Sequence, residues 1–308
     1  MIMRISAAEL YRQIMNKTTS QLTALFHEYS PEDVISATRS TEAFANEVYD
    51  ITISGGQRYF LKILKKQLPE AIATEAHMQK RLLAAGIKAP EYLEIKPGQY
   101  VGEHNSTRFI LSKYIPGTSP KKVTPGLIES FGEILARLHD ALKDVDVAPS
   151  IMQWLNLARV ERDLAGYDGE VKGILNQLVQ RGKVVFERDL PVATIHGDLW
   201  MSNIFAKGDT ITTVFDLETA ENTVRLIDLA RTYTSMRFNS AYSAAEIIEW
   251  LTTGYNAAAT RSLTSEEESS FNLAIGYVSG ACATWHAIHG TRYRDPYISF
   301  GKEALRIS

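Results

Sequence analysis

The sequence has a single cysteine, no long apolar run and no excess of basic residues. One cysteine, Cys282, excludes an intramolecular disulfide and a thiolate metal cluster. A net charge of −3 argues against a general nucleic-acid-binding protein, because such proteins are usually basic. No apolar run approaches the roughly 20 residues that cross a bilayer, and the N-terminus lacks a signal-peptide pattern. We therefore expect a cytoplasmic protein whose partners include neither nucleic acid nor membrane.

The first third of the chain is predicted to be rich in strands. Apolar and polar residues alternate from Tyr49 to Ile63 around the turn Gly55-Gly56, which indicates a β-hairpin. Lys62 lies in its second strand, on the same face as Phe60 and Leu64. The other elements predicted here are helices at Ser6–Met15, Gln21–His27 and Glu70–Ala85 and strands at Tyr92–Ile95, Tyr100-Val101 and Arg108–Tyr114.

The remainder of the chain is predicted to be mostly helical. Helices are expected after the cap Thr124-Pro125 and over Ile151–Leu164, Val171–Val184, Ala244–Ala258 and Glu266–His289. The strands predicted here are Ala193–Ile195, Asn203–Phe205 and Ile211–Phe215. The expected fold class is therefore α+β, with a small antiparallel-sheet lobe over residues 1–115 and a larger helical lobe over residues 116–308.

The stretch from His196 to Asp216 carries the residues that suggest chemistry. Phosphoryl transfer needs a carboxylate that accepts the proton of the attacking hydroxyl, and hard oxygen ligands that hold magnesium on the phosphates. Asp198 is placed to be the base in this arrangement. Asn203 and Asp216, which follow an intervening loop and a strand, are placed to be the metal ligands.

The D-x-x-x-x-N pattern from Asp198 to Asn203, followed by a strand-end aspartate, resembles the catalytic loop of protein kinases. His196-Gly197-Asp198 resembles more specifically the aminoglycoside phosphotransferase and choline kinase superfamily. The resemblance runs from about Val34 to about Arg237. It implies a bilobal protein-kinase-like fold with an N-terminal nucleotide-binding lobe. It also implies ATP as co-substrate, Mg2+ as cofactor, and transfer of the γ-phosphoryl group to a hydroxyl of a small molecule.

The N-terminal lobe holds candidates for nucleotide binding. Lys62 and Glu75 are predicted to form the lysine–glutamate pair that such kinases use to hold phosphates. The alternative is a solvated lysine and a solvated helix glutamate, and it is weaker for Lys62, whose neighbours Leu61 and Ile63 are apolar. The loop after Arg39 has no glycine, unlike the loop in the superfamily, and Ser40 and Thr41 are the hydroxyls it offers to phosphate. The segment before Pro116 resembles the hinge between lobes, where the backbone of Ser112 and Tyr114 is expected to bind adenine.

Four further residues are predicted to support the site or to lie apart from it. His196 and Asp228 are expected to be structural, with Asp228 bracing the catalytic loop from the start of a helix. His139 is predicted to be a buried hydrogen-bonding residue. Arg231 is predicted to be a surface charge.

The identity of the acceptor is weakly encoded. Ala220-x-Asn222 followed by Asp228-Leu-Ala resembles bacterial homoserine kinases, and Asp216-x-Glu218 resembles choline kinases. The run from His196 to Trp200 resembles fructosamine kinases. Glu218 is a candidate contact for a substrate ammonium group, and Trp200 is a candidate wall of the acceptor pocket. An amino alcohol, a hydroxy amino acid, a sugar and an aminoglycoside all remain open as acceptors.

Two other interpretations remain open. The glycine-free phosphate loop is compatible with a pseudokinase that binds nucleotide as a regulator, although every catalytic residue is present. A protein kinase is the second alternative, but no Asp-Phe-Gly or Ala-Pro-Glu follows Asp216. Turnover of a small hydroxyl compound would distinguish both alternatives from a small-molecule kinase.

Overall fold

The computed structural model describes residues 17–40, 47–65, 67–148, 150 and 152–307, so the helix expected at Ser6–Met15 lies outside the described residues. The chain divides into two compact units. The first contains the described residues up to Ala76 and Pro90–Pro116, and the second contains His77–Ala89 and the described residues from Gly117 onward. The first unit holds an antiparallel sheet and the second is mostly helical, which confirms the predicted α+β class.

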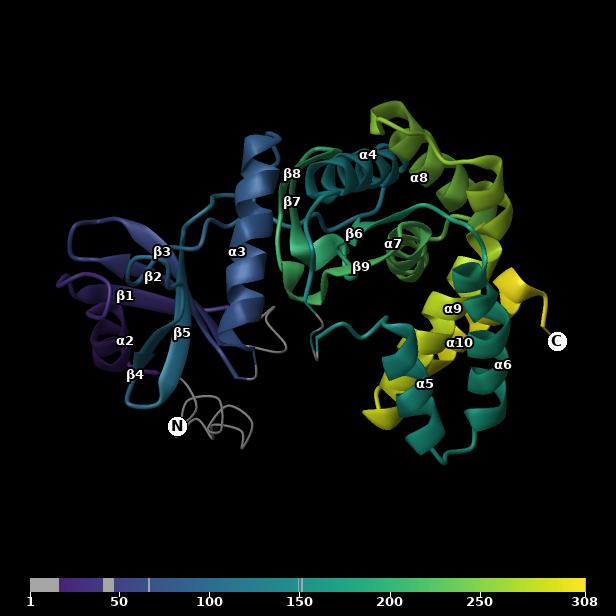
Figure 1. Cartoon of the computed structure of the whole chain (residues 1–308). Helices are drawn as coiled ribbons and strands as arrows, with labels where there is room; N and C mark the ends of the chain where they lie inside the picture. Colours follow the sequence, from purple (N-terminus) through teal and green to yellow (C-terminus); the bar gives the residue numbers. More distant parts are fainter. Residues whose placement is uncertain (1–16, 41–46, 66, 149, 151, 308) are drawn as a thin grey trace, which may run out of the picture. The chain divides into compact units, whose positions relative to one another are not determined.

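The first unit is built on a five-stranded antiparallel sheet in the order β1-β2-β3-β5-β4 (Figure 1). Its strands are β1 (Val34–Arg39), β2 (Glu47–Ile53), β3 (Arg58–Ile63), β4 (Gly102–His104) and β5 (Thr107–Lys113). The predicted hairpin is confirmed, with Tyr49 opposite Leu61. Helix α2 (Thr19–Phe26) packs its buried residues Leu22, Leu25 and Phe26 into the core formed with these strands.

The strand expected at Tyr92–Ile95 is wrong, and the one expected around Tyr100-Val101 lies slightly later, at Gly102–His104. Tyr92 makes only an isolated bridge to Ser112, and pairing along this segment begins at Gly102. A turn at Gly98, where φ is +74°, separates this part of the chain from β4. The edge strand of the sheet is therefore the short β4.

Helix α3 (Pro69–Ala84) covers the sheet face that carries Lys62. Leu64, Ile72 and Ile110 belong to one buried cluster, so Leu64 and Ile110 face α3. Lys62 lies two residues before Leu64 and directly opposite Ile110, so it lies on the same face. From His77 onward, α3 belongs to the second unit.

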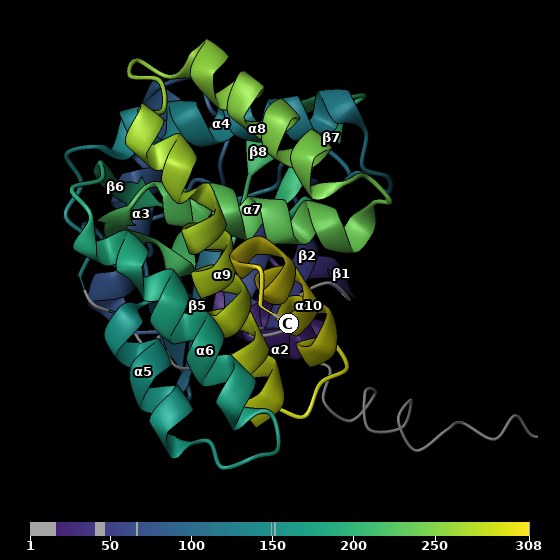
Figure 2. The ribbon, with the colours of Figure 1, turned by 90° about the vertical axis from the view of Figure 1, so that its right-hand side faces the viewer.

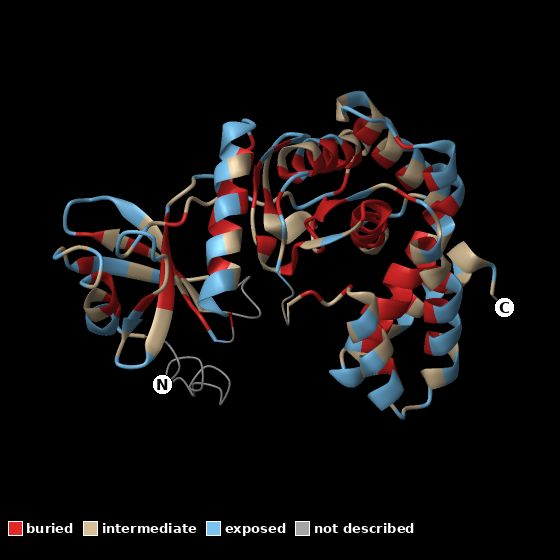
Figure 3. Cartoon of the chain, viewed as in Figure 1, coloured by how far each residue is buried: buried red, intermediate tan, exposed pale blue. Residues whose placement is uncertain are grey.

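The second unit is organised around helix α7, which is buried from Leu226 to Met236 (Figure 3). Helix α9 packs against α6, α7 and α10, and α4 packs against α8 (Figure 2). The helices of this unit are α4 (Pro125–Leu142), α5 (Leu157–Gly166), α6 (Lys172–Gly182), α7 (Leu226–Asn239), α8 (Ala244–Ala258), α9 (Ser265–Ile288) and α10 (Arg294–Leu305). Among the described residues, no helix has the length and apolar character of a membrane span.

Two short two-stranded sheets place the loops of interest. They pair β6 (Val192–Ile195) with β9 (Glu221–Val224) and β7 (Ile204–Lys207) with β8 (Thr210–Val214). Three 3-10 turns accompany them, at Lys183–Glu187, Met201–Asn203 and Leu217–Thr219. Strand β9 and helix α10 were not predicted. Because β9 returns beside β6, the loop after β6 and the loop after β8 are fastened side by side.

Candidate functional site

Asp228 holds the loop that follows β6. Its carboxylate accepts the backbone N–H of His196 at 2.7 Å and of Gly197 at 2.9 Å, and it is fully buried in the first turn of α7. Burial alone would raise the pKa of Asp228, but hydrogen bonds from the His139 ring and from the loop backbone lower it below the usual value. Asp228 therefore remains an ionised acceptor that fixes the start of the loop.

A buried hydrogen-bond chain extends from Asp228 to α8. The Nε2 of His139 donates to Asp228 at 3.1 Å, and its Nδ1 accepts the Tyr255 hydroxyl at 2.9 Å. This pattern assigns the proton of a neutral His139 ring to Nε2. His139 is 4% exposed, as the sequence predicted for a buried hydrogen-bonding residue.

Two reciprocal hydrogen bonds join this loop to the one after β8. The Nε2 of His196 donates to the carbonyl of Phe215 at 2.8 Å, and the Thr219 hydroxyl donates to the carbonyl of His196 at 2.8 Å. Gly197 has φ of +78°, and a Cβ there would lie 2.6 Å from the carbonyl oxygen of Thr219. Glycine is therefore required where the two loops meet.

Asn203 and Asp216 are brought together by the β7–β8 pair. The backbone N–H of Phe215 donates to the carbonyl of Asn203 at 2.9 Å, so Asp216 directly follows a residue bonded to Asn203. The side-chain Nδ2 of Asn203 donates to the carbonyl of Asp198 at 2.9 Å, which turns its Oδ1 the other way. Asp216 has the left-handed conformation, with φ of 66° and ψ of 64°, uncommon outside glycine.

These two residues fit a magnesium ion of the kind that substrate phosphates help to hold. The Asn203 amide oxygen and the Asp216 carboxylate are hard oxygen donors, and Mg2+ on phosphates usually takes only one or two protein ligands. No group of three or more histidine, cysteine, aspartate or glutamate side chains suited to a metal occurs in the described part of the chain. The two oxygen donors could therefore hold a metal ion together with the phosphates of a nucleotide.

Asp198 lies between the two metal-ligand candidates and α7. Its side chain is 25% exposed, and its Oδ2 is 3.5 Å from the Nδ2 of Asn203. Burial raises the pKa of Asp198, the charge of Arg231 lowers it, and the nearby Asp216 carboxylate raises it further. A carboxylate in this setting can take up a proton more readily than one in water.

Arg231 is buried, which contradicts the prediction of a surface charge. It is 6% exposed, and its Nε and Nη2 donate to Oδ1 of Asp198 at 3.1 and 2.7 Å. The rings of Trp154 and Trp200 lie 5.4 and 5.8 Å from its guanidinium carbon. A signal for this was present in the sequence, because Arg231 follows Asp228 by three residues and so lies on the same face of α7. Trp200, predicted to line the acceptor pocket, is thereby placed near Arg231.

Glu218, the other candidate for acceptor binding, lies half-buried in the turn that follows Asp216. Its place next to Asp216 follows directly from the chain. The backbone turn Leu217–Thr219 is held by the N–H of Ala220, which donates to the carbonyl of Leu217 at 3.0 Å. Glu218 is therefore carried on a segment that is fixed at both ends.

The residues expected to bind nucleotide lie in the first unit. Glu75 is 2% exposed and accepts the Tyr92 hydroxyl at 2.7 Å. Lys62 is half-buried on the sheet face covered by α3, the helix that carries Glu75. The N–H of Ser40 donates to the carbonyl of Val48 at 2.8 Å. Thr41 lies outside the described residues.

The segment expected to bind adenine continues the sheet. Ser112 is 5% exposed and pairs with Phe60, and the N–H of Tyr114 donates to the carbonyl of Arg58 at 3.2 Å. The guanidinium of Arg58 lies over the Tyr114 ring, 3.6 Å from its centre. Since its N–H is engaged in the sheet, any contact of the Tyr114 backbone with adenine falls to its carbonyl oxygen.

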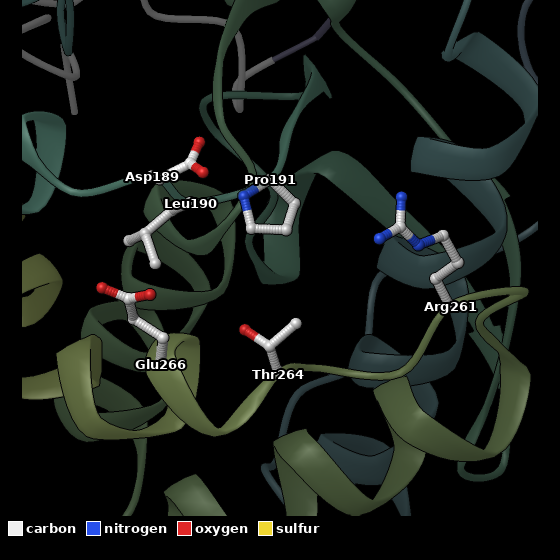
Figure 4. A pocket seen from close by; sticks show the side chains of 6 residues that line it. All are labelled: Asp189, Leu190, Pro191, Arg261, Thr264 and Glu266. Atoms are coloured by element: carbon white, nitrogen blue, oxygen red, sulfur yellow. The ribbon is translucent and has the colours of Figure 1, made fainter.

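A pocket of about 350 Å³ lies elsewhere in the second unit (Figure 4). Its lining residues are Asp189, Leu190, Pro191, Arg261, Thr264 and Glu266. Pro191 immediately precedes β6, whereas His196 immediately follows it, so the pocket and the loop that carries Asp198 lie at opposite ends of this strand. The pocket is therefore separate from the cluster around Asp198.

The chain is similar to known phosphotransferases in sequence and in fold. The model of the phosphotransferase enzyme family matches residues 37–261. A homoserine kinase of Granulibacter bethesdensis is 27% identical over 263 residues, covering 82% of this chain and 81% of that protein. A homoserine kinase of Methylobacillus glycogenes is 27% identical over 179 residues, covering 58% of this chain and 56% of that protein. The solved structure of an amicoumacin kinase with AMP-PNP and Ca2+ is similar with a TM-score of 0.75 at 15% identity, covering 98% of this chain and 96% of that one.

Proposed function

Because the chain belongs to the phosphotransferase enzyme family, we propose that it transfers the γ-phosphoryl group of ATP to a hydroxyl of a small amino-bearing metabolite, with homoserine as the first candidate. The observation that carries the proposal is the joining of Asp198, Asn203 and Asp216 at one end of the β7–β8 pair. Phosphoryl transfer depends mainly on positioning and on charge stabilisation, and this cluster is fixed by buried hydrogen bonds from α7.

Asp198 acts as the general base in this proposal. Its Oδ1 is bonded to Arg231, so Oδ2 is the atom that receives the proton of the attacking hydroxyl. The raised pKa favours proton uptake at that atom as the oxygen–phosphorus bond forms.

Asn203 and Asp216 would hold Mg2+ through their side-chain oxygens. When bound, the ion would supply positive charge to the phosphate oxygens. The side chain of Asn203 is aimed by its own bond to the carbonyl of Asp198, which ties the metal ligand to the base. This coupling keeps the two functional groups at a constant separation.

In the first unit, Lys62 would bind phosphate oxygens and Glu75 would orient Lys62. Support for this comes from their common placement, since both lie where α3 covers the sheet. Ser40 and Thr41 would add hydroxyl contacts to phosphate. Ser112 and Tyr114 would bind adenine through their backbone.

The choice of acceptor rests on the relatives. The homoserine kinases named above, one covering 82% of this chain, favour a hydroxy amino acid. The run from Ala220 to Ala230 carries the same homoserine-kinase pattern. Glu218 would bind the acceptor's ammonium group, and Trp200 would form a wall beside Asp198.

The test is a coupled ADP-release assay with Mg-ATP and a panel of homoserine, choline, ethanolamine, fructosamine and kanamycin. We expect turnover of homoserine by the natural protein. Asp198→Asn should lower kcat by about 10³-fold or more, since general-base catalysis contributes 10²–10⁴ and the base also orients the nucleophile. ATP binding, measured by calorimetry, should change by less than about threefold. ATP binding with no turnover across the panel would instead favour a regulator.

A further inference from the structure

Arg231 contacts Asp198 in an asymmetric way. Its Nε and Nη2 donate to the same carboxylate oxygen, Oδ1, at 3.1 and 2.7 Å. Arginine–carboxylate pairs often place one N–H on each oxygen. Here both N–H groups lie on one oxygen, so the two oxygens of Asp198 differ in their surroundings.

The second oxygen has a different neighbour. Oδ2 of Asp198 lies 3.5 Å from the Nδ2 of Asn203, whose shorter bond goes to the carbonyl of Asp198 at 2.9 Å. A carboxylate on a single rotatable bond would otherwise exchange its oxygens by turning. Two charge-assisted bonds to Oδ1 hold the group in one orientation, with Oδ2 as the more weakly engaged atom.

The guanidinium is itself held in place. The rings of Trp154 and Trp200 lie near it, and its Nη1 lies 3.4 Å from the hydroxyl of Thr234. The Thr234 hydroxyl donates to the carbonyl of Arg231 at 2.7 Å. A planar group fixed on several sides sets direction in a way that a flexible ammonium group does not.

We infer that Arg231 is a positioning residue for the phosphoryl-transfer reaction: it fixes Oδ1 of Asp198 so that Oδ2 faces the attacking hydroxyl. This inference rests on the proposed function, in which Asp198 is the base. Arg231 touches neither acceptor nor nucleotide in this role. It acts through the orientation of Asp198, so its effect belongs in kcat and not in the affinity for ATP.

A purely structural ion pair is the alternative, and the chain contains one for comparison. Arg225 and Glu267 form a buried pair at 2.6 and 2.9 Å, and each Glu267 oxygen receives one N–H of the guanidinium. The Glu267 side chain is fully buried, whereas the Asp198 side chain is 25% exposed. Arg225 thus provides a matched control, because it is a buried arginine near the start of the same helix and its partner carboxylate, Glu267, is fully buried.

The experiment compares Arg231→Met, Arg231→Lys and Arg225→Met in the ADP-release assay, with Mg-ATP and the panel compound that gives the highest turnover. We expect Arg231→Met to lower kcat by about 10- to 100-fold, a part of the general-base contribution, with KM for ATP within about twofold. Arg231→Lys, which keeps the charge, should recover part of the loss. Arg225→Met should keep kcat within about threefold per folded molecule.

A double-mutant cycle identifies the route of the effect. If Arg231 acts through Asp198, then Asp198→Asn/Arg231→Met should be no slower than Asp198→Asn alone. Losses that multiply in the double variant would overturn the inference, as would a loss confined to KM for ATP. Full turnover by Asp198→Asn would instead overturn the proposed function. If Arg231→Met does not fold, the same cycle with Arg231→Lys gives the answer.

Discussion

Two buried arginines near the start of α7 form ion pairs, and the pairs differ in how many oxygens of the carboxylate are bonded to the arginine. Arg225 precedes the helix and pairs with Glu267 of α9, and it also donates to the carbonyls of Arg261 and Ser262. Arg231, two turns along, pairs with Asp198 of the catalytic loop. Both arginines are under 10% exposed, so their burial alone does not distinguish them.

The difference lies in the carboxylates. Both oxygens of Glu267 accept a guanidinium N–H, and Glu267 also caps α9 by accepting the backbone N–H of Thr264 at 2.8 Å. Only one oxygen of Asp198 accepts hydrogen bonds from Arg231, and the Asp198 side chain is partly exposed to solvent. A buried pair with every group satisfied fixes the fold, whereas a pair with one oxygen left over can do chemistry.

The largest expected effect is the loss of stability when the Arg225–Glu267 pair is broken. Arg225→Met should destabilise the protein by about 3–5 kcal/mol, because it leaves the Glu267 charge buried without its partner. Arg231→Met should cost less, about 1–3 kcal/mol, since water can reach Asp198. Calorimetric melting should therefore show a larger drop in Tm for Arg225→Met. The reverse order would mean that exposure of the carboxylate does not separate the two pairs.

A second change tests whether the loss at Arg225 is the cost of an unpaired charge. Adding Glu267→Gln to Arg225→Met removes that charge and keeps a side chain able to complete the capping box of α9. We expect the double variant to regain about 1–3 kcal/mol relative to Arg225→Met. No recovery would show that the lost stability comes from packing of the arginine itself. Melting of the three variants in one buffer gives the comparison.

The two arginines show which parts of the site can be predicted from the sequence and which cannot. The grouping of Asp198, Asn203 and Asp216 was predictable because the three residues lie close together in the chain, at spacings set by one loop and one hairpin. The reaction class followed from the same residues, and the family match confirms it. Both arginine pairs join residues more than 30 positions apart, so no local pattern connects them.

The elements that were missed have a similar cause. Strand β9, Glu221–Val224, has no alternation of apolar residues and exists because β6 pairs with it. Helix α5 begins at Leu157 and not at Ile151, because the Asn156 side chain caps it by accepting the N–H of Arg159. Tertiary pairing and a cap, respectively, decided these boundaries.

A smaller effect concerns how the stability supplied by the Arg225–Glu267 pair depends on pH. Burial would raise the pKa of Glu267, but hydrogen bonds from Arg225 and Thr264 lower it below the usual value near 4.3. A lowered pKa in the folded state adds stability above the unfolded value, and that stability is lost as pH falls through the folded pKa. We therefore expect the difference in Tm between the natural protein and Glu267→Gln to become smaller as the pH falls from about 5 to about 3. A gap that stays constant over this range would show that the charge of Glu267 contributes nothing.

The smallest expected effect is at Tyr255, where the two regions meet. Its hydroxyl donates to Nδ1 of His139, within the chain that braces Asp228, and accepts a bond from Nη1 of Arg225 at 3.2 Å. Tyr255→Phe keeps the ring and removes both bonds, so it should cost about 1–2 kcal/mol of stability. Since His139 can still donate to Asp228, the catalytic loop should stay in place and kcat should fall by no more than about threefold. Melting and ADP release measured on the same preparation separate the two effects. A large fall in kcat with little change in Tm would mean that the Arg225–Glu267 pair influences Asp198 through Tyr255. Arg225 could then no longer be called a structural arginine in contrast to Arg231.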